Sequence, residues 1–307
     1  MPFADNALSP ASECAPVLWT DWEALPVQPA FSRDGLRETL DGGQMFRWNM
    51  GADGVWTGIW GRRVARLRES AGGLEASFPA GSGLDAVPAL RGLLGLDLPY
   101  GEYYSALGSR GDAVMVRAVS ACSGLRIVSL SLDEALLSFL CSPMKRIPQI
   151  KQVLDSLARA FGQELLPGMH ALPSWERLAG VDEAALRGCR LGYRARSVAG
   201  TAAFLALRPG FLDLVRAQPY AGARKLLMKL PGVGGKIADC ALLFSGTSAL
   251  SPFPVDTWIS RAMADLYGLE GLNPEQTAEF GRNLFGEQAG LAQQFIFILS
   301  RQGRTRP

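Results

Sequence analysis

The stretch from Leu230 to Cys240, LPGVGGKIADC, limits most strongly what this chain can fold into. A proline and three glycines fall within five residues, and a lysine then opens a run, IADCALLF, that is almost wholly apolar. Proline ends a helix, and glycine allows the positive φ angles and close approaches of a tight turn. We therefore predict two helices joined by a hairpin, with positive φ at Gly232 and Gly234. The second helix should start near Gly235 and place Lys236 at the entrance to the core.

This hairpin has the features of an anion-binding site. The first backbone N–H groups of a helix have no partner within it and lie at the positive end of its dipole. A phosphate can reach such N–H groups directly where side chains are missing. We therefore expect residues Gly232, Val233, Gly234 and Gly235 to hold a nucleic-acid backbone irrespective of its sequence. A plain helical hairpin without a ligand also fits the pattern, although it needs fewer glycines.

A nucleotide-binding P-loop is excluded by spacing. That motif needs a glycine five residues before Gly235, where this chain has Leu230. It also needs Ser or Thr after the lysine, and the residue there is Ile237. No strand-like segment precedes the turn.

The charge distribution points to a polyanion. The net charge of the 307 residues is only +2, but residues 144–236 contain fifteen Lys and Arg residues against six Asp and Glu residues. This third of the chain therefore carries +9 and the remainder −7. A basic third in a near-neutral protein favours a nucleic-acid surface. For any single residue, a solvated helix face explains the charge equally well.

Cysteine and histidine usage excludes several classes of site. The five cysteines form no C-x-x-C pair, so neither a disulfide framework nor a zinc or iron–sulfur site is indicated. The single histidine, His170, rules out metal centres that need two, and we expect it to be a surface or packing residue. No cofactor is expected. Without a secretory signal or an apolar run long enough to span a bilayer, we expect a cytoplasmic protein with no membrane partner.

The hydrophobic pattern changes character along the chain and predicts an α+β protein. We expect an extended N-terminal lead-in over residues 1–28 and a small antiparallel β-sheet domain over 29–110, with its strands between Phe46 and Phe78. Apolar residues then recur at helical spacing, which predicts an all-α domain of about ten short helices over 111–302. Residues 303–307 are expected to form a flexible basic tail.

Helix caps can be predicted inside the all-α part. Helix N-caps are expected at Asp133, Asp182 and Asn273, and glycines that mark helix ends are expected at Gly210, Gly222 and Gly268. The segment FPVDTW supplies a further N-cap, Asp256, for the helix TWISRAMADLY. Two helix starts, at Lys236 and Asp256, can then meet at one surface.

Four motifs in order along the chain resemble one family. LPGVGGKIADC followed by PVD is similar to the helix–hairpin–helix–GPD superfamily of DNA glycosylases, and most closely to its 8-oxoguanine DNA glycosylase/AP lyase branch. The other matching segments are GGQMFRW at 42–48, LGYRAR at 191–196 and AQQFIF at 292–297. The similarity extends from about Gly35 to Gln302.

The resemblance implies a DNA repair enzyme that flips a damaged nucleotide out of duplex DNA. Lys236 would attack C1′ of the sugar as a neutral amine, which partial burial among apolar neighbours favours. The resulting Schiff base allows β-elimination and a strand nick. Asp256 would stay ionised and stabilise the positive charge that develops at C1′.

The resemblance also assigns a base pocket. The backbone carbonyl of Gly43 would accept the N7–H that 8-oxoguanine has and guanine lacks. Cys240 and Phe297 would sandwich the ring, and Gln293 would read its Watson–Crick edge. From spacing alone, Cys240 and Phe297 would be ordinary core residues.

The residues that would contact the DNA strands match the family pattern only in part. Tyr193 would wedge into the base stack and Arg194 would contact the opposite base. Met144 stands where better-known members have an asparagine, and Gln149 where they have an arginine that selects cytosine. We therefore predict a relaxed preference for cytosine. Trp258 replaces a frequent histidine and is expected to pack or to lie near a phosphate.

The sequence is also compatible with two other functions. The chain could be a glycosylase of this superfamily for another damaged base, or a non-catalytic helix–hairpin–helix module that binds DNA. The absence of cysteines after Cys240 argues against members with an iron–sulfur loop, and Lys236 argues against alkylbase glycosylases. The resemblance further implies a monomer whose partner is damaged double-stranded DNA, located at the nucleoid or in the nucleus. No metal is expected on side chains, although a monovalent cation on the backbone of 230–235 is compatible with the family.

Overall fold

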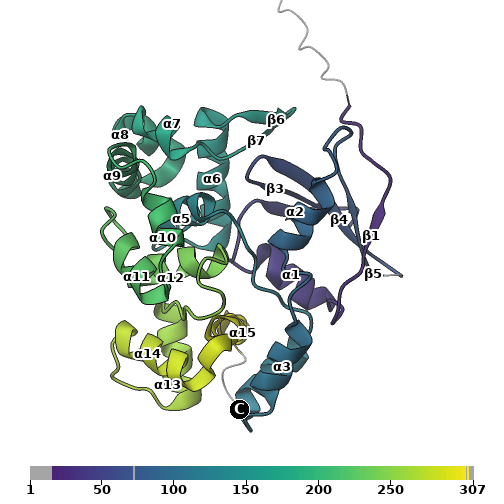
Figure 1. Ribbon diagram of the computed structural model, residues 1–307, viewed down its shortest axis with the longest axis vertical. Helices are drawn as coiled ribbons and strands as arrows, with labels where there is room; N and C mark the ends of the chain where they lie inside the picture. Colours follow the sequence, from purple (N-terminus) through teal and green to yellow (C-terminus); the bar gives the residue numbers. More distant parts are fainter. Residues whose placement is uncertain (1–15, 72, 302, 304–307) are drawn as a thin grey trace, which may run out of the picture.

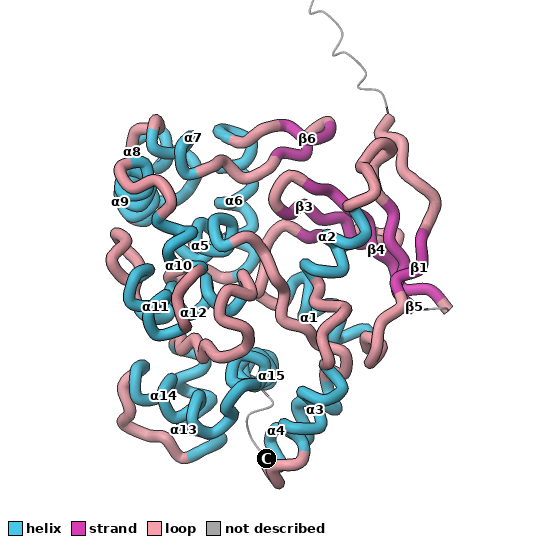
Figure 2. Tube along the Cα trace, viewed as in Figure 1, coloured by secondary structure: helices cyan, strands magenta, loops and turns pink. Residues whose placement is uncertain are grey.

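The computed structural model describes residues 16–71, 73–301 and 303. It has a small sheet domain beside a larger helical domain, as Figures 1 and 2 show. Residues 1–15 of the predicted lead-in and 304–307 of the predicted tail lie outside the described residues. The α+β fold class predicted from the sequence is confirmed.

The sheet has five antiparallel strands in the order β1-β5-β4-β3-β2. Every neighbouring pair is antiparallel, as expected for strands joined by short turns. The strands are β1 (Glu23–Leu25), β2 (Trp48–Met50), β3 (Trp56–Trp60), β4 (Arg63–Ser70) and β5 (Gly73–Ser77). The strands predicted between Phe46 and Phe78 are confirmed. One further strand, β1, falls within 1–28 and pairs with β5, so the sheet begins earlier than predicted.

Three helices in the sheet domain were not predicted from the sequence. They are α1 (Arg33–Asp41), α2 (Ala86–Leu93) and α3 (Tyr100–Gly108); α1 and α2 lie beside the strands, and α3 lies below the sheet near α15 (Figure 1). Helix α1 begins at the N-cap Ser32, whose side chain accepts a hydrogen bond from the backbone of Gly35. Residues 29–110 are therefore a mixed α and β unit rather than a sheet alone.

The helical domain follows the predicted segments closely. Its helices are α4 (Ala113–Ala121), α5 (Leu132–Leu140), α6 (Ile147–Phe161), α7 (Trp175–Ala179), α8 (Glu183–Leu186), η1 (Arg187–Leu191), α9 (Arg194–Ala206), α10 (Phe211–Arg216), α11 (Tyr220–Leu227), α12 (Gly235–Phe244), α13 (Thr257–Tyr267), α14 (Pro274–Phe285), η2 (Gly286–Gln288) and α15 (Ala289–Arg301). A two-stranded hairpin of β6 (Glu164–Leu166) and β7 (Met169–His170) interrupts them. In the part of the chain that the structure describes, no helix combines the length and apolarity needed to cross a bilayer.

Asp182, Asn273 and Gly268 have their predicted capping roles, whereas Asp133, Gly210 and Gly222 do not. Asp182 and Asn273 cap α8 and α14 through their side chains, and Gly268 ends α13 in the left-handed conformation. Gly210, also left-handed, immediately precedes α10. The predicted N-cap Asp133 instead lies in the first turn of α5, because Ser131 two residues earlier accepts the capping hydrogen bond. Gly222 lies inside α11, which already starts at Tyr220.

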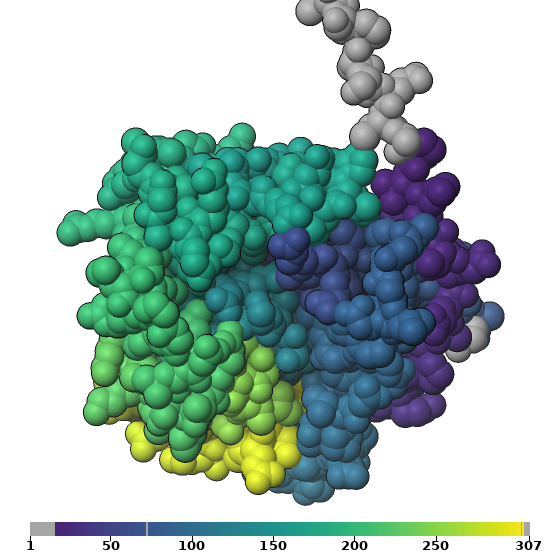
Figure 3. All heavy atoms as spheres, turned by 45° about the horizontal axis from the view of Figure 1, so that its top comes forward, coloured from purple at the N-terminus to yellow at the C-terminus, as the bar shows by residue number. Residues whose placement is uncertain are grey.

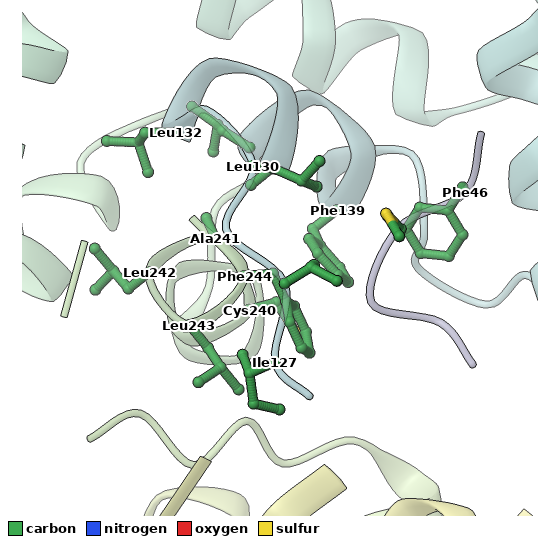
Figure 4. Close-up of a cluster of buried hydrophobic side chains, with 14 of the residues drawn as sticks. Phe46, Ile127, Leu130, Leu132, Phe139, Cys240, Ala241, Leu242, Leu243 and Phe244 are labelled. Carbon is green, nitrogen blue, oxygen red and sulfur yellow. The ribbon is translucent and has the colours of Figure 1, made fainter. Parts of the chain in front are cut away.

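The two domains share one core, and helices α5 and α12 lie at its centre. The Phe139 ring of α5 meets Phe46 of the sheet domain edge-on at 5.5 Å and stacks on Phe244 of α12 at 5.2 Å. Figure 4 shows Phe139 between Phe46 and the α12 residues. The helix that opens with Lys236 is thus buried along most of its length.

Polar contacts also tie the two domains together along the surface where they meet (Figure 3). Arg47 of the sheet domain donates to the backbone carbonyl of the half-buried residue His170 at 2.7 Å. The backbone N–H of Gly61 donates to the buried carboxyl group of Glu134 at 2.6 Å. Burial raises the pKa of Glu134, and nearby Arg47 opposes that rise.

Candidate active site

The hairpin between α11 and α12 has the predicted form but uses its glycines differently. Gly232 has φ +80°, and a Cβ there would lie 2.3 Å from the Ser197 hydroxyl oxygen on α9. Both the backbone conformation and this close approach therefore require glycine. Gly234 has φ −93° and ψ 179°, which is extended backbone. The positive φ predicted for Gly234 is therefore wrong. A Cβ on Gly234 would meet no atom within 4 Å, so open space lies in front of it.

The remaining hairpin residues anchor the turn. Val233 is buried, so only its backbone is available to a ligand. A Cβ on Gly235 would lie 2.3 Å from Arg224 and from Glu275, which form an ion pair at 2.7 Å beside the helix start. Gly234, the N-cap of α12, offers no side chain to the first N–H groups of that helix. These donors therefore face outward beside an exposed glycine, as an anion site requires.

Lys236 stands in the first turn of α12, and one residue of α5 and one just after it lie beside its amine. Nζ donates to the Ser142 hydroxyl oxygen at 3.2 Å. It also lies 5.1 Å from the centroid of the Phe139 ring. The lysine is partly buried, whereas Ile237, Ala238 and Cys240, which follow it, are buried. The amine thus has a fixed position at the rim of the core.

Asp256 opens α13 as the predicted N-cap. One carboxylate oxygen, Oδ1, accepts hydrogen bonds from the backbone N–H groups of Trp258 and Ile259, both at 2.9 Å. These two hydrogen bonds fix the direction of the carboxylate at the positive end of the helix dipole.

The buried thiol of Cys240 lies within electrostatic range of both helix starts. Burial raises the pKa of this thiol to about 12. The neighbouring Lys236 opposes this rise, and Asp256 adds to it. An amine from α12 and a carboxylate from the start of α13 therefore act on the same buried sulfur atom.

Three of the four predicted base-pocket residues lie on α15 and the loop after α1, whereas Cys240 lies on α12. Gly43 has φ +97°, and a Cβ there would lie 3.2 Å from Ile147 and 3.6 Å from Phe297. Gln293 lies one turn before Phe297 on α15 and is only 5% exposed. Its Oε1 has no hydrogen-bond partner among the described residues. A buried acceptor without a partner destabilises a protein by about 1–3 kcal/mol, so a ligand donor would suit this position.

Neighbouring contacts hold the Gly43 loop in place. The carbonyl of Gly42 accepts hydrogen bonds from Gln294 at 3.5 Å and from Arg301 at 3.1 Å, both on α15. The guanidinium of Arg301 also lies 5.6 Å from the Phe297 ring centroid. Sequence reasoning missed Gln294 and Arg301, although Gln294 stands inside the AQQFIF motif beside Gln293.

Two predicted DNA-wedging residues are exposed side chains. Met144 is 92% exposed and has φ +52°, a strained conformation for a residue with a side chain. Tyr193 is 57% exposed at the start of α9. Exposed apolar side chains on short loops are suited to entering a base stack.

Arg194 and Gln149 have structural partners that the sequence did not predict. Arg194 is only 6% exposed, and it donates to the carbonyls of Pro143, at 2.8 Å from Nε, and Leu191, at 3.2 Å. Its guanidinium also lies 4.4 Å from the Tyr193 ring centroid. The predicted contact with the opposite base would require Arg194 to leave these carbonyls. Gln149 accepts from the backbone of Arg146 at 2.9 Å and so closes the N-terminal capping box of α6.

Comparison with known proteins settles the family. Residues 31–136 match the family model described as "8-oxoguanine DNA glycosylase, N-terminal domain". The chain is 31% identical over 278 residues to the N-glycosylase/DNA lyase OGG1 of Arabidopsis thaliana, an alignment covering 85% of this chain and 75% of that protein. The chain belongs to the 8-oxoguanine DNA glycosylase family. Its relatives are bifunctional enzymes by name, and the resemblance stated from the sequence is confirmed.

Solved structures of this family superpose well on the chain. The 8-oxoguanine glycosylase/lyase of Clostridium acetobutylicum, in complex with double-stranded DNA containing cytosine opposite 8-oxoG, has a TM-score of 0.82 at 27% identity and covers 92% of this chain and 99% of that one. MBOgg1 in complex with a low affinity DNA ligand has a TM-score of 0.81 at 30% identity, over 87% of this chain and 92% of that one. The 3-methyladenine DNA glycosylase of Archaeoglobus fulgidus, at 20% identity, shares only the fold.

Proposed function

We propose that this chain excises 8-oxoguanine from duplex DNA and then nicks the strand at the resulting abasic site, with Lys236 as nucleophile. The fixed position of the Lys236 amine in the first turn of α12, together with the Asp256 carboxylate held at the start of α13, carries this proposal. Family membership supports it, because relatives are named as glycosylases and lyases and one of them was solved with DNA containing 8-oxoG.

The chemistry follows from the residue types. The lone pair of a neutral Lys236 amine forms a bond to C1′ of the flipped nucleotide as the bond from C1′ to N9 of the base breaks. The base leaves with that electron pair and takes a proton, while the nitrogen loses one. Opening of the sugar gives a Schiff base, and loss of a C2′ proton then expels the 3′ phosphate. The Asp256 carboxylate stabilises the positive charge at C1′ during the first step.

Base selection rests on the pocket beside this pair. The Gly43 carbonyl accepts the N7–H of 8-oxoguanine, and the unpartnered oxygen of Gln293 accepts a donor from the Watson–Crick edge. Phe297 and Cys240 contact the two faces of the ring. Guanine has no hydrogen on N7, so it would leave the carbonyl unpaired, a mismatch that polar pockets reject strongly.

DNA binding rests on the hairpin and the basic third of the chain. The outward N–H groups at Gly234 and Gly235 hold a phosphate, and a monovalent cation on the backbone of 230–235 can bridge to another. Met144 and Tyr193 fill the gap left by the flipped base, and Trp258 lies near a phosphate. With Gln149 closing a helix cap, opposite-base selection is relaxed. The enzyme acts as a monomer without a cofactor in the cytoplasm, at the nucleoid of a bacterium, or in the nucleus of a eukaryote.

Excision should be measured on duplexes that carry 8-oxoguanine opposite each of the four bases, with and without alkaline work-up to separate base release from nicking. Borohydride trapping then tests the nucleophile. Trapping should disappear in Lys236→Gln and persist in the control Lys225→Gln, an exposed lysine on α11. Undiminished trapping in Lys236→Gln would show that another amine does the chemistry. A preference for another damaged base would move the chain elsewhere in the superfamily.

A further inference from the structure

The hydroxyl group of Ser142 lies against the amine of Lys236. Ser142 follows the last turn of α5 and is 6% exposed. Its Oγ lies 3.2 Å from Lys236 Nζ and 2.8 Å from the carbonyl oxygen of Phe139. No pattern in the sequence indicates this contact, because the two residues are 94 positions apart.

The geometry fixes the direction of the hydrogen bond to Lys236. A serine hydroxyl has one hydrogen, and here Ser142 donates it to the Phe139 carbonyl. Only the lone pairs of Oγ therefore face Lys236, and the amine must be the donor. When a neutral amine donates one N–H in a fixed direction, its own lone pair points away from that acceptor. The Phe139 ring covers a second side of the amine, so few orientations remain.

The loop that carries Ser142 is itself held in place. The next residue, Pro143, accepts hydrogen bonds from Arg194 through Nε and a terminal nitrogen. The residue after that is Met144, which is strained and exposed. Ser142 thus contacts the amine, Pro143 contacts Arg194 and Met144 faces the solvent. The position of Ser142 therefore depends on a loop that Arg194 holds in place.

We propose that Ser142 is a positioning residue that directs the lone pair of Lys236 toward C1′. This rests on the proposed function and deepens it, because Ser142 acts only through the amine. The other groups placed around that amine are the Phe139 ring on α5 and the Cys240 thiol on α12. Neither Phe139 nor the buried thiol offers an oxygen acceptor in place of the hydroxyl.

The test uses a duplex that already contains an abasic site, so that Schiff-base formation is measured without base recognition. Rates of borohydride trapping are compared across pH for wild type, Ser142→Ala and Ser142→Thr. The alanine variant should reach a limiting rate about 10- to 100-fold lower, because the amine is no longer oriented. Threonine retains the hydroxyl and should restore the rate.

The matched control is Ser105→Ala on α3, where an exposed serine also bonds a carbonyl of its own helix, and it should behave as wild type. Melting temperatures and affinity for a duplex with a tetrahydrofuran abasic analogue identify misfolded variants. A folded Ser142→Ala that traps as fast as wild type overturns the proposal, as does a folded threonine variant that traps as slowly as the alanine variant. Failure of the proposed function is distinct, because wild type would then trap nothing or Lys236→Gln would trap normally.

Discussion

Replacing Gly232 and Gly234 separately by alanine tests how the hairpin works. The two glycines stand two residues apart in one turn, yet their environments differ completely. At Gly232, alanine must adopt φ +80°, which strains an L-residue by about 1–2 kcal/mol. Its Cβ would also lie 2.3 Å from the Ser197 hydroxyl oxygen, and overpacking of this kind typically adds about 1–3 kcal/mol. We expect Gly232→Ala to lower the free energy of unfolding by about 2–5 kcal/mol.

At Gly234 the same substitution should leave the fold nearly unchanged. The backbone is extended and no atom lies within 4 Å of the new Cβ. Alanine is a poorer N-cap than glycine, but it reduces the entropy of the unfolded chain, and these effects of about 0.5–1 kcal/mol nearly offset each other. The new methyl group would, however, stand where we place the phosphate. Loss of one charge-assisted hydrogen bond, about 1.5–3 kcal/mol, should weaken DNA binding roughly tenfold or more.

Urea denaturation with linear extrapolation measures both stabilities, and titration of an abasic-analogue duplex measures binding. The expected result is a division of effects, with stability lost in Gly232→Ala and affinity lost in Gly234→Ala. Equal stability of the two variants would refute the strain and contact argument. Unchanged DNA affinity in Gly234→Ala would refute the phosphate site.

Three further substitutions test other parts of the site. Gln293→Met removes a buried acceptor without a partner, so thermal or urea denaturation should show about 1 kcal/mol more stability while 8-oxoguanine excision slows; a less stable variant would contradict this. Asp256→Asn retains the N-cap, so the free energy of unfolding should change by less than about 0.5 kcal/mol. The single-turnover excision rate should fall about 100-fold or more, and a rate near wild type would contradict the catalytic role of Asp256. Because the pKa of Glu134 is raised in the folded state, its stabilising contribution is complete below the ordinary value near 4.5 and is lost as pH rises through the folded pKa. Glu134→Gln should therefore gain stability relative to wild type between pH 4 and pH 7, as urea titrations at several pH values would show, and a constant difference would exclude this linkage.

Local chemistry made much of the fold predictable. Hydrophobic spacing located the helices from α8 to α15, and short side chains before apolar runs marked Asp182, Asp256 and Asn273 as N-caps. The failures also have local causes. Asp133 lost its predicted cap to Ser131 because two capping residues stand close together and only one fits the first turn. The sequence pattern predicts a positive φ at Gly234, but the backbone there is extended. What this position requires of glycine is the absence of a side chain.

The site was predictable only through its motifs, because its contacts join distant parts of the chain. Gly43 meets Phe297, and Ser142 meets Lys236, through packing that no periodicity encodes. Arg194 illustrates the opposite problem. Its place in LGYRAR suggested an exposed reader of bases, but in the fold it turns inward to the Pro143 carbonyl. Whether a polar side chain faces a ligand or a neighbouring loop is decided by tertiary structure.

The proposed mechanism requires that Lys236 is the residue that forms a bond to the sugar. Peptide mapping of the borohydride-reduced adduct, with mass spectrometry to locate the attached deoxyribose fragment, tests this most directly. We predict that the fragment is on Nζ of Lys236, in the peptide that begins after Lys229. A fragment on Lys145, on Lys229 or on the N-terminal amine would contradict the mechanism proposed for this site.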